Sequence, residues 1–219
     1  MGAPSVCRGR KPMMKKFLMA SAAIFTLATA SQAADVAPAP VLAPANWFVK
    51  IGGTYVMPDS NGTLAGVNTI TAGNTFTGTV EAGRFLTDRI SVSLSGGIPP
   101  THAIIRNGTD TGKTVTLGAF ALDAQFHLVN NDKFDAYVGA GVAYNIYFSS
   151  TNPAITSVDN GFAPVLQIGA EYKATKNIGL FVDVKKEFFT TRINYTPAFL
   201  SFQERLDPLA VTAGVAFHF

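Results

Sequence analysis

The sequence predicts an all-β protein, an eight-stranded antiparallel transmembrane β-barrel with short periplasmic turns and long extracellular loops. Three observations support this fold class. Apolar and polar residues alternate with a period of two in eight segments. Charged residues make up 14% of the chain, against about 25% in soluble domains, yet no apolar run beyond residue 33 reaches the ~18 residues of a spanning helix. The connections alternate between short and long, as in outer-membrane barrels.

An export signal precedes the strands. Lys15 and Lys16 are followed by an apolar stretch, and Ser31-Gln32-Ala33 offers the small residues that a signal peptidase reads. This order predicts a signal peptide over residues 1–33, cleaved after Ala33. The alternative, a membrane-anchor helix, is disfavoured because the apolar stretch is short and a proline-rich segment follows it.

The N-terminal segment also explains the charge and the cysteine content. Five of the 17 Lys+Arg residues lie in residues 1–33, which contain no acid, so 12 basic and 14 acidic residues give residues 34–219 a net charge of −2. Nucleic-acid binding therefore loses its main support. Cys7, the single cysteine, lies in residues 1–12, which an over-long start would explain, since Met1, Met13 and Met14 are all candidate starts. The predicted mature chain contains no disulfide and no Cys-based metal site.

The barrel is predicted over residues 47–219, after a Pro/Ala-rich periplasmic lead-in at residues 34–46. Each segment places bulky apolar residues on one face and small or polar residues on the other. The segments are 47–55, 79–83, 90–95, 120–128, 136–148, 166–172, 178–185 and 209–219. The connections at 86–89, 129–133 and 174–177 are short, whereas those at 57–74, 98–112, 149–161 and 189–206 are long and are predicted to be loops.

A secreted lipocalin-type barrel is the main alternative, because it also has about eight antiparallel strands. Its interior would be apolar and its exterior polar. Here the polar row is small and glycine-rich, as at Gly139, Gly141 and Gly169, and suits the crowded inside of a narrow barrel. The apolar row is bulky and ends on Phe219, which favours a surface that faces lipid.

The inward row carries charged residues that form the first candidate site. Its members are Lys50, Glu81, Asp123, His127, Glu171, Asp183 and Lys185. One hypothesis is a polar path or a coupled proton site. The other, which we favour, is a network of salt bridges and hydrogen bonds that fills the lumen, because charges taken out of water must be paired.

Aromatic residues form two further sets. Phe48, Tyr137, Tyr147 and Phe181 share the inward parity, so they either line an apolar lumen pocket or, as we favour, pack the barrel. A second set lies toward strand ends on the outward parity and is predicted to form the interface girdles: Trp47, Tyr55, Tyr144, Tyr172, Phe217 and Phe219.

The sequence contains no pattern that indicates an enzyme or a cofactor site. His102, His127 and His218 fall in a loop, in mid-barrel and at the C-terminal rim, so their spacing predicts no metal cluster. A glycine-rich phosphate loop and a nucleophile elbow are also absent from the sequence. We therefore expect no catalytic residues and no bound cofactor.

The ordered segments resemble the OmpW family of small outer-membrane β-barrel proteins. The resemblance rests on residues 47–52, 83–94, 137–144 and 207–219 and spans residues 47–219. It implies a multi-pass barrel in the bacterial outer membrane, a narrow channel for small hydrophobic compounds and an exit sideways through the barrel wall. The implied partners are outer-membrane lipid, a hydrophobic solute, and the assembly machinery acting on the C-terminal strand. The rival function is a non-transporting structural or surface-recognition barrel that acts through its extracellular loops.

Two departures from the family pattern affect these expectations. Ala119-Phe120 stands where the family has a Pro-Pro pair, and the switch of apolar parity there predicts a β-bulge instead. Ser95 and Lys185 stand near the positions of the family's apolar constriction, so we expect a polar constriction at that level.

Overall fold

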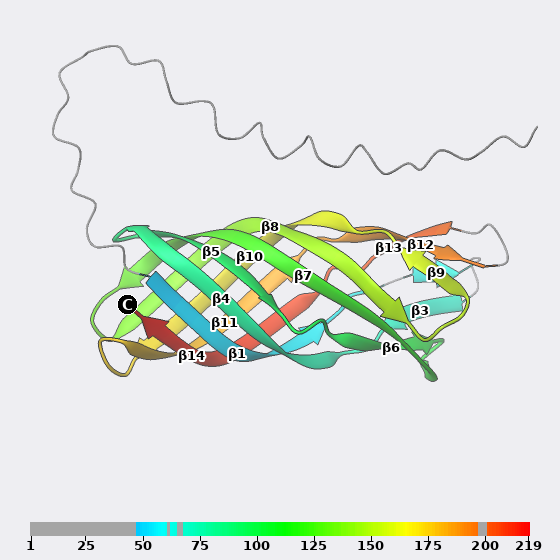
Figure 1. Cartoon of the computed structure of the whole chain (residues 1–219), viewed down its shortest axis with the longest axis horizontal. Coiled ribbons are helices and arrows are strands. Elements are labelled where there is room, and N and C mark those ends of the chain that lie inside the picture. The colour runs from blue at the N-terminus through cyan, green and yellow to red at the C-terminus, as the bar shows by residue number, and fades with distance from the viewer. Residues whose placement is uncertain (1–46, 61, 65–67, 197–200) are drawn as a thin grey trace, which may run out of the picture. The chain divides into compact units, whose positions relative to one another are not determined.

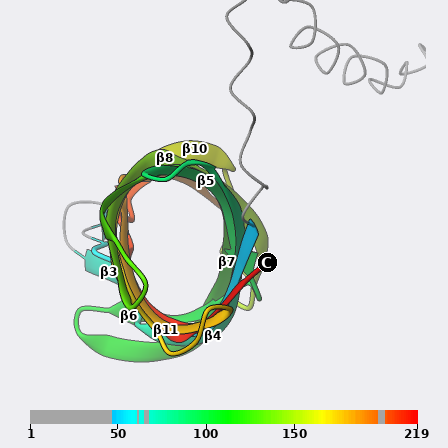
Figure 2. The same cartoon turned by 90° about the vertical axis from the view of Figure 1, so that its left-hand side faces the viewer.

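The computed structural model describes residues 47–60, 62–64, 68–196 and 201–219. The predicted signal peptide and lead-in lie outside these residues. The described chain is built from β-strands, and none of its segments is a helix long and apolar enough to cross a membrane. Eight antiparallel strands form a closed ring, which Figure 2 shows end-on. The ring strands are β1 (Trp47–Met57), β4 (Thr75–Thr87), β5 (Ile90–Gly97), β7 (Thr109–Asn130), β8 (Phe134–Ser150), β10 (Gly161–Lys173), β11 (Ile178–Glu187) and β14 (Leu209–His218).

The first and last strands close the ring. β1 and β14 pair antiparallel from Phe48 opposite His218 to Met57 opposite Leu209. At the rim that holds both ends of the barrel, Phe219 N donates to Trp47 O (2.9 Å). The ring follows chain order, so each ring strand pairs with its neighbours in sequence. The predicted all-β, eight-stranded barrel is confirmed.

The three short turns share one local device. Each has a Thr or Asn side chain that accepts hydrogen bonds from backbone N–H groups two and three residues later. The acceptors are Thr87, Asn131 and Thr175, with distances from 2.8 to 3.3 Å. These bonds satisfy turn donors without further residues. The turns all lie at the rim where the C-terminus is marked in Figure 1.

At the opposite end, the segments predicted to be loops contain strands, which corrects the prediction. β2 (Gly62–Leu64), β3 (Asn68–Ala72) and β6 (Thr101–Arg106) extend the barrel sheet, and β9 (Ile155–Val158), β12 (Thr190–Tyr195) and β13 (Ser201–Arg205) form a second sheet (Figure 1). The β6–β7 hairpin turns at Asn107-Gly108, both with positive φ. Asn-Gly is a typical type I′ sequence, because both central residues must adopt positive φ.

A β-bulge lies near the predicted position, but its extra residue is on β8 and not on β7. The β7–β8 register shifts between Thr116 and Leu117, which pair with Ser149 and Tyr147, so Phe148 of β8 has no opposite residue. On β7, Leu117, Ala121 and Asp123 all face inward, so the switch of parity predicted for this strand at Ala119-Phe120 is wrong. Leu117 packs inside, although the sequence pattern grouped it with Val115 on the apolar parity.

The alternation of side chains separates the two surfaces of the barrel. Even-numbered residues from 120 to 128 of β7 and from 178 to 182 of β11 are exposed, with Leu122 at 62% and Val182 at 52%, whereas the adjacent Asp123 and Asp183 are buried. Successive side chains of a strand point to opposite faces. The apolar exterior is therefore the surface that contacts lipid, and the polar row faces the lumen.

We expect Leu122→Arg and Val182→Arg each to lower the free energy of unfolding in lipid by ~2–4 kcal/mol, because each places a cation near the middle of the bilayer. Leu86→Arg is the matched control. Leu86 is also exposed but lies beside the β4–β5 turn, where the penalty falls to about 0–1 kcal/mol. Urea unfolding of the barrel in lipid vesicles measures the three effects, and equal values would contradict the assigned membrane depth.

Candidate functional site

The ring strands carry all seven predicted lumen residues into the interior. Six are buried, and Lys185 is half-buried. They come from five strands: Lys50 from β1, Glu81 from β4, Asp123 and His127 from β7, Glu171 from β10, and Asp183 and Lys185 from β11. Closure of the ring brings these distant segments together. Because the groups are removed from water, each charge requires partners inside the barrel.

Lys185 is the centre of the main network. Its Nζ donates to Asp123 Oδ2 (2.6 Å) and to Ser95 Oγ (2.9 Å), and lies 2.9 Å from Glu81 Oε2. These three contacts match the three protons of an ammonium group. β11 and β5, which carry Lys185 and Ser95, lie opposite each other in the ring. The side chain therefore crosses the lumen and obstructs its axis.

Lys50 makes a second crossing. Its Nζ donates to Tyr137 Oη (2.9 Å), and this hydroxyl donates to Asp183 Oδ2 (2.8 Å). Asp183 Oδ2 also accepts from Gln167 Nε2 (2.7 Å), and Lys50 Nζ lies 3.8 Å from Glu81. β1 and β8, which carry Lys50 and Tyr137, are again opposite in the ring. The two lysines thus occupy the interior at neighbouring levels.

Two glutamines join the charged groups into one network. Gln125 Nε2 donates to Glu81 Oε1 (2.8 Å) and lies 3.3 Å from Gln167 Oε1. Sequence reasoning did not select Gln167, because an uncharged amide on a strand gives no distinctive signal. Its position on the inward parity of β10, two residues before Gly169, was the available clue. These contacts favour the hypothesis of a network that fills the lumen over the hypothesis of an open polar path.

The four inward aromatic residues do not form one pocket. Phe48, Tyr137 and Phe181 surround the Lys50 ammonium, which lies 4.9, 4.1 and 5.6 Å from their ring centroids. Such cation–π contacts stabilise a desolvated cation. Tyr147 lies apart from them, half-buried opposite Leu117 near the far end of β8. The first three therefore support the lysine, and only Phe181 lines the cavity described below.

A Ser–His–Asp arrangement lies nearer the short turns. His127 Nδ1 is 2.7 Å from Asp135 Oδ1, and Nε2 is 2.9 Å from Ser91 Oγ. Ser91 donates its single proton to Gln125 Oε1 (2.9 Å). Because a hydroxyl has one proton and the serine gives it to the amide oxygen of Gln125, His127 does not receive that proton, and this geometry does not activate a nucleophile.

The other histidines have separate partners. His218 Nε2 lies 2.6 Å from Glu171 Oε1 near the short-turn rim, and His102 Nδ1 lies 2.8 Å from Gly73 O at the opposite end. Among the described residues, His, Cys, Asp and Glu form no group of three that could hold a metal ion.

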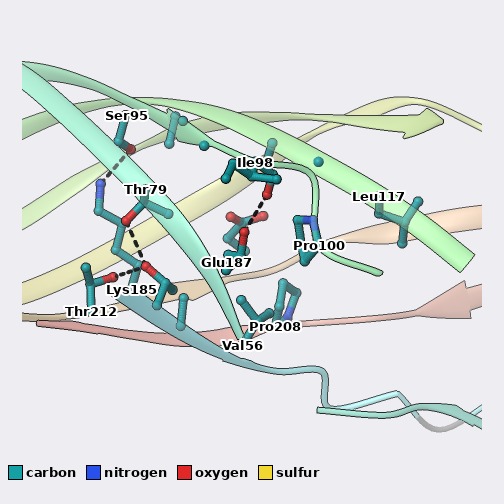
Figure 3. A pocket seen from close by; sticks show the side chains of 18 of the residues that line it. Val56, Thr79, Ser95, Ile98, Pro100, Leu117, Lys185, Glu187, Pro208 and Thr212 are labelled. Carbon is teal, nitrogen blue, oxygen red and sulfur yellow. Dashed lines mark hydrogen bonds between the residues drawn. The ribbon is translucent and has the colours of Figure 1, made fainter. Parts of the chain in front are cut away.

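A cavity of about 160 Å³ lies in the half of the barrel away from the short turns. Lys185, Ser95, Thr79 and Thr212 lie at one end of it in Figure 3, and Leu117, Pro100 and Pro208 lie at the other. Ala163, Phe189 and Leu206 form a buried cluster with Leu117, and the last three of these line the apolar end. The cavity is therefore polar where the network crosses the lumen, and apolar toward the end of the barrel that lies away from the short turns.

The wall beside this cavity is interrupted. Pairing of β4 with β5 ends at Thr79 opposite Gly97, followed by one bond from Ile98 N to Gly78 O (3.0 Å). The next backbone bond between these two segments is Gly73 N to Ala103 O (2.7 Å). Pro99 and Pro100 lie between and have no N–H to donate. We call this interruption, from Gly78 and Ile98 to Gly73 and Ala103, the wall gap.

The cavity borders the wall gap. Its lining includes Val80, Gly96 and Ile98, from the two segments on either side of the gap. Ile98 is 71% exposed. Across the gap, Thr77 Oγ1 donates to Ile98 O (2.6 Å). The cavity thus lies between the polar network of the lumen and the wall gap.

The predicted interface aromatics lie toward the two ends of the barrel. Trp47, Phe217, Phe219 and Tyr172 are near the short-turn rim, whereas Tyr55 and Tyr144 are farther along their strands. All six are exposed or half-buried. Two further aromatic residues, Phe76 and Phe162, were not predicted from the sequence. Phe76 lies opposite Tyr55 and Phe162 lies opposite Tyr144, and each is more exposed than the tyrosine that it faces.

Comparisons with known proteins agree with the geometry. The model of the OmpW family matches residues 45–219. The chain is 28% identical over 185 residues to the uncharacterized outer-membrane protein y4mB of Sinorhizobium fredii, covering 79% of this chain and 80% of that protein. It is 25% identical over 189 residues to the dibenzothiophene metabolism operon protein PahQ of Pseudomonas aeruginosa, covering 79% and 88%. The crystal structure of the outer membrane protein OprG from Pseudomonas aeruginosa shares the fold, with a TM-score of 0.69 and 18% identity over 80% of this chain and 96% of that chain.

We predict that Lys185→Met lowers the free energy of unfolding in lipid by about 3–5 kcal/mol, because it leaves Asp123 and Glu81 without their shared cation. Adding Asp123→Asn should restore part of the loss. Lys113→Met, at an exposed position of β7, is the control. An unchanged stability of Lys185→Met, together with a new ion selectivity in planar bilayers, would show that Lys185 lines an open pore.

A further prediction concerns Glu204 on β13, outside the membrane-spanning segments. Burial raises the pKa of Glu204 to about 7 from an ordinary value of 4.5. The folded form therefore holds the proton more tightly, and the free energy of unfolding should fall by up to about 3 kcal/mol as pH rises from 4.5 through 7. Glu204→Gln should remove this dependence, whereas Asp132→Asn, in a short turn, should leave it. Urea unfolding at pH 4 to 9 makes the comparison.

Proposed function

Because the chain belongs to the OmpW family and is an outer-membrane β-barrel, we propose that it passes small hydrophobic molecules from the cell exterior into the outer-membrane lipid. The supporting observation is the cavity, which the lysine network borders on one side and the wall gap borders on the other. A solute would enter at the apolar end, past Phe189 and Leu206, and leave sideways.

Two features favour this route over passage along the axis. The side chains of Lys50 and Lys185 cross the lumen between opposite strands, so water and ions meet a closed interior. An eight-stranded barrel also has room only for its own side chains or one small ligand. A general porin function is therefore excluded by size.

The name of one relative supports an apolar aromatic solute. PahQ is described as a dibenzothiophene metabolism operon protein, and dibenzothiophene is a fused-ring compound without ionisable groups. The apolar end of the cavity, bordered by Leu117, Phe189 and Leu206, suits an aromatic ring.

We also infer that residues 1–33 direct export, that residues 34–46 are a periplasmic lead-in and that the assembly machinery binds the C-terminal strand. The support is the order of charged, apolar and small residues before Ala33, and the exposed Phe219 that follows β14 at the periplasmic rim.

Blocking the wall gap tests the proposed function. An added Cβ at Gly78 would meet only Ile98 Cδ1, at 3.6 Å, so Gly78→Phe fits without backbone strain and covers the outer mouth. Ala82→Phe, on the same exposed face of β4 but away from the gap, is the matched control. Uptake is measured in Gram-negative cells with radiolabelled toluene, a single-ring hydrocarbon of a size that fits the cavity.

We expect cells with the wild type or Ala82→Phe to take up toluene faster than cells without the protein, and cells with Gly78→Phe to lose most of this gain. Equal uptake with and without the wild-type protein would refute the proposed function and favour the structural or surface-recognition barrel. Equal uptake by Gly78→Phe and wild type would refute the sideways exit.

A further inference from the structure

The charged groups that line the cavity are unequal in number. Three are acids, Glu81, Asp183 and Glu187, and two are bases, Lys50 and Lys185. A fourth carboxylate, Asp123, lies directly behind Lys185 and is bound to it. Acidic groups therefore outnumber basic groups at the polar end of the cavity, and this imbalance bears on which polar group a ligand can carry.

Both lysines are already committed to protein partners. The ammonium of Lys185 has three oxygen partners at 2.6 to 2.9 Å. The ammonium of Lys50 donates to Tyr137 and lies close to three aromatic rings. A carboxylate entering the cavity would therefore find no uncommitted cation and would lie near three acids, which is unfavourable for a desolvated anion.

Glu187 is the carboxylate placed to meet a ligand. It lies between the polar and apolar ends of the cavity in Figure 3, at the end of β11 and two residues before Phe189. Its Oε2 accepts a hydrogen bond from Asn145 Nδ2, which is long at 3.2 Å. A carboxylate can accept about four hydrogen bonds. This group thus has acceptor capacity beside an apolar surface.

We propose that the cavity selects small amphipathic molecules with a hydrogen-bond-donating cationic end, such as aryl-alkyl primary amines. The ammonium binds Glu187, and the ring packs against Leu117, Phe189 and Leu206. The volume of about 160 Å³ is close to that of a protein cavity that holds benzene, so a single ring fits. This inference rests on the proposed function and narrows its substrate class.

Binding of four ligands of similar size tests the inference: benzylamine, benzyl alcohol, toluene and benzoate. The full barrel is placed in nanodiscs of phosphatidylcholine, and dissociation constants are measured by ligand-observed NMR after subtraction of empty nanodiscs. We expect benzylamine to bind at least tenfold more tightly than toluene and benzyl alcohol, and benzoate to bind most weakly. Raised salt should weaken benzylamine binding alone.

Glu187→Gln should remove the advantage of benzylamine and leave toluene unchanged. Glu204→Gln, at a buried carboxyl that does not line the cavity, is the matched control and should bind like the wild type. The ligand series on the wild type decides the question even if Glu187→Gln fails to fold.

The outcomes separate this inference from the proposed function. Toluene and benzyl alcohol binding as tightly as benzylamine, or benzoate binding most tightly, would overturn the selection for cations while passage of hydrophobic molecules stands. Absence of binding by all four ligands would overturn both.

Discussion

Lipid offers a peptide group no hydrogen-bond partner, and the rest of this structure depends on that constraint. Every strand that crosses the membrane needs a neighbour on each side, so the sheet must close on itself. The register between β1 and β14 achieves this closure, from Phe48 opposite His218 to Met57 opposite Leu209. Closure with eight strands also sets the width of the interior, which leaves little more than the space that side chains occupy.

A narrow interior determines how its charges are arranged. Lys185 and Lys50 reach strands on the opposite side of the ring, because the lumen is narrow enough for one side chain to span it. Removing these ammonium groups from water is unfavourable, and the surrounding carboxylates and aromatic rings offset that cost. The result is an interior that side chains fill at mid-barrel, with a cavity toward the end away from the short turns.

Several polar groups of the wall gap are absent or paired, which favours its contact with lipid. Pro99 and Pro100 have no N–H, the carbonyl of Ile98 accepts from Thr77, and the carbonyl of Pro100 accepts from Leu117 N at 3.2 Å. An interruption at other residues would expose backbone donors to hydrocarbon. Ser95 and Lys185 make the middle of the barrel polar, and an apolar cluster with Leu117, Phe189 and Leu206 lies farther from the short turns.

The sequence by itself determined which residues face lipid and which face the lumen. Side chains alternate along a strand, so the exposed Leu122 and the buried Asp123 could be assigned without knowing any partner strand. Strand number and the short turns followed from the same period. The β6–β7 hairpin also had a local signal in Asn107-Gly108, although that segment was predicted to be a loop.

The tertiary structure alone decided which interior residues meet. Lys185 and Ser95 are 90 residues apart in sequence, and their contact depends on which strands lie opposite after the ring closes. The role of Tyr137 in the polar network and the separation of Tyr147 from the other aromatics have the same origin. The cavity likewise depends on the closed ring, because its lining comes from several strands that are far apart in the sequence. Period-two alternation gives the face of each side chain but not its level or its opposite strand, because these are set by the pairing register around the closed ring.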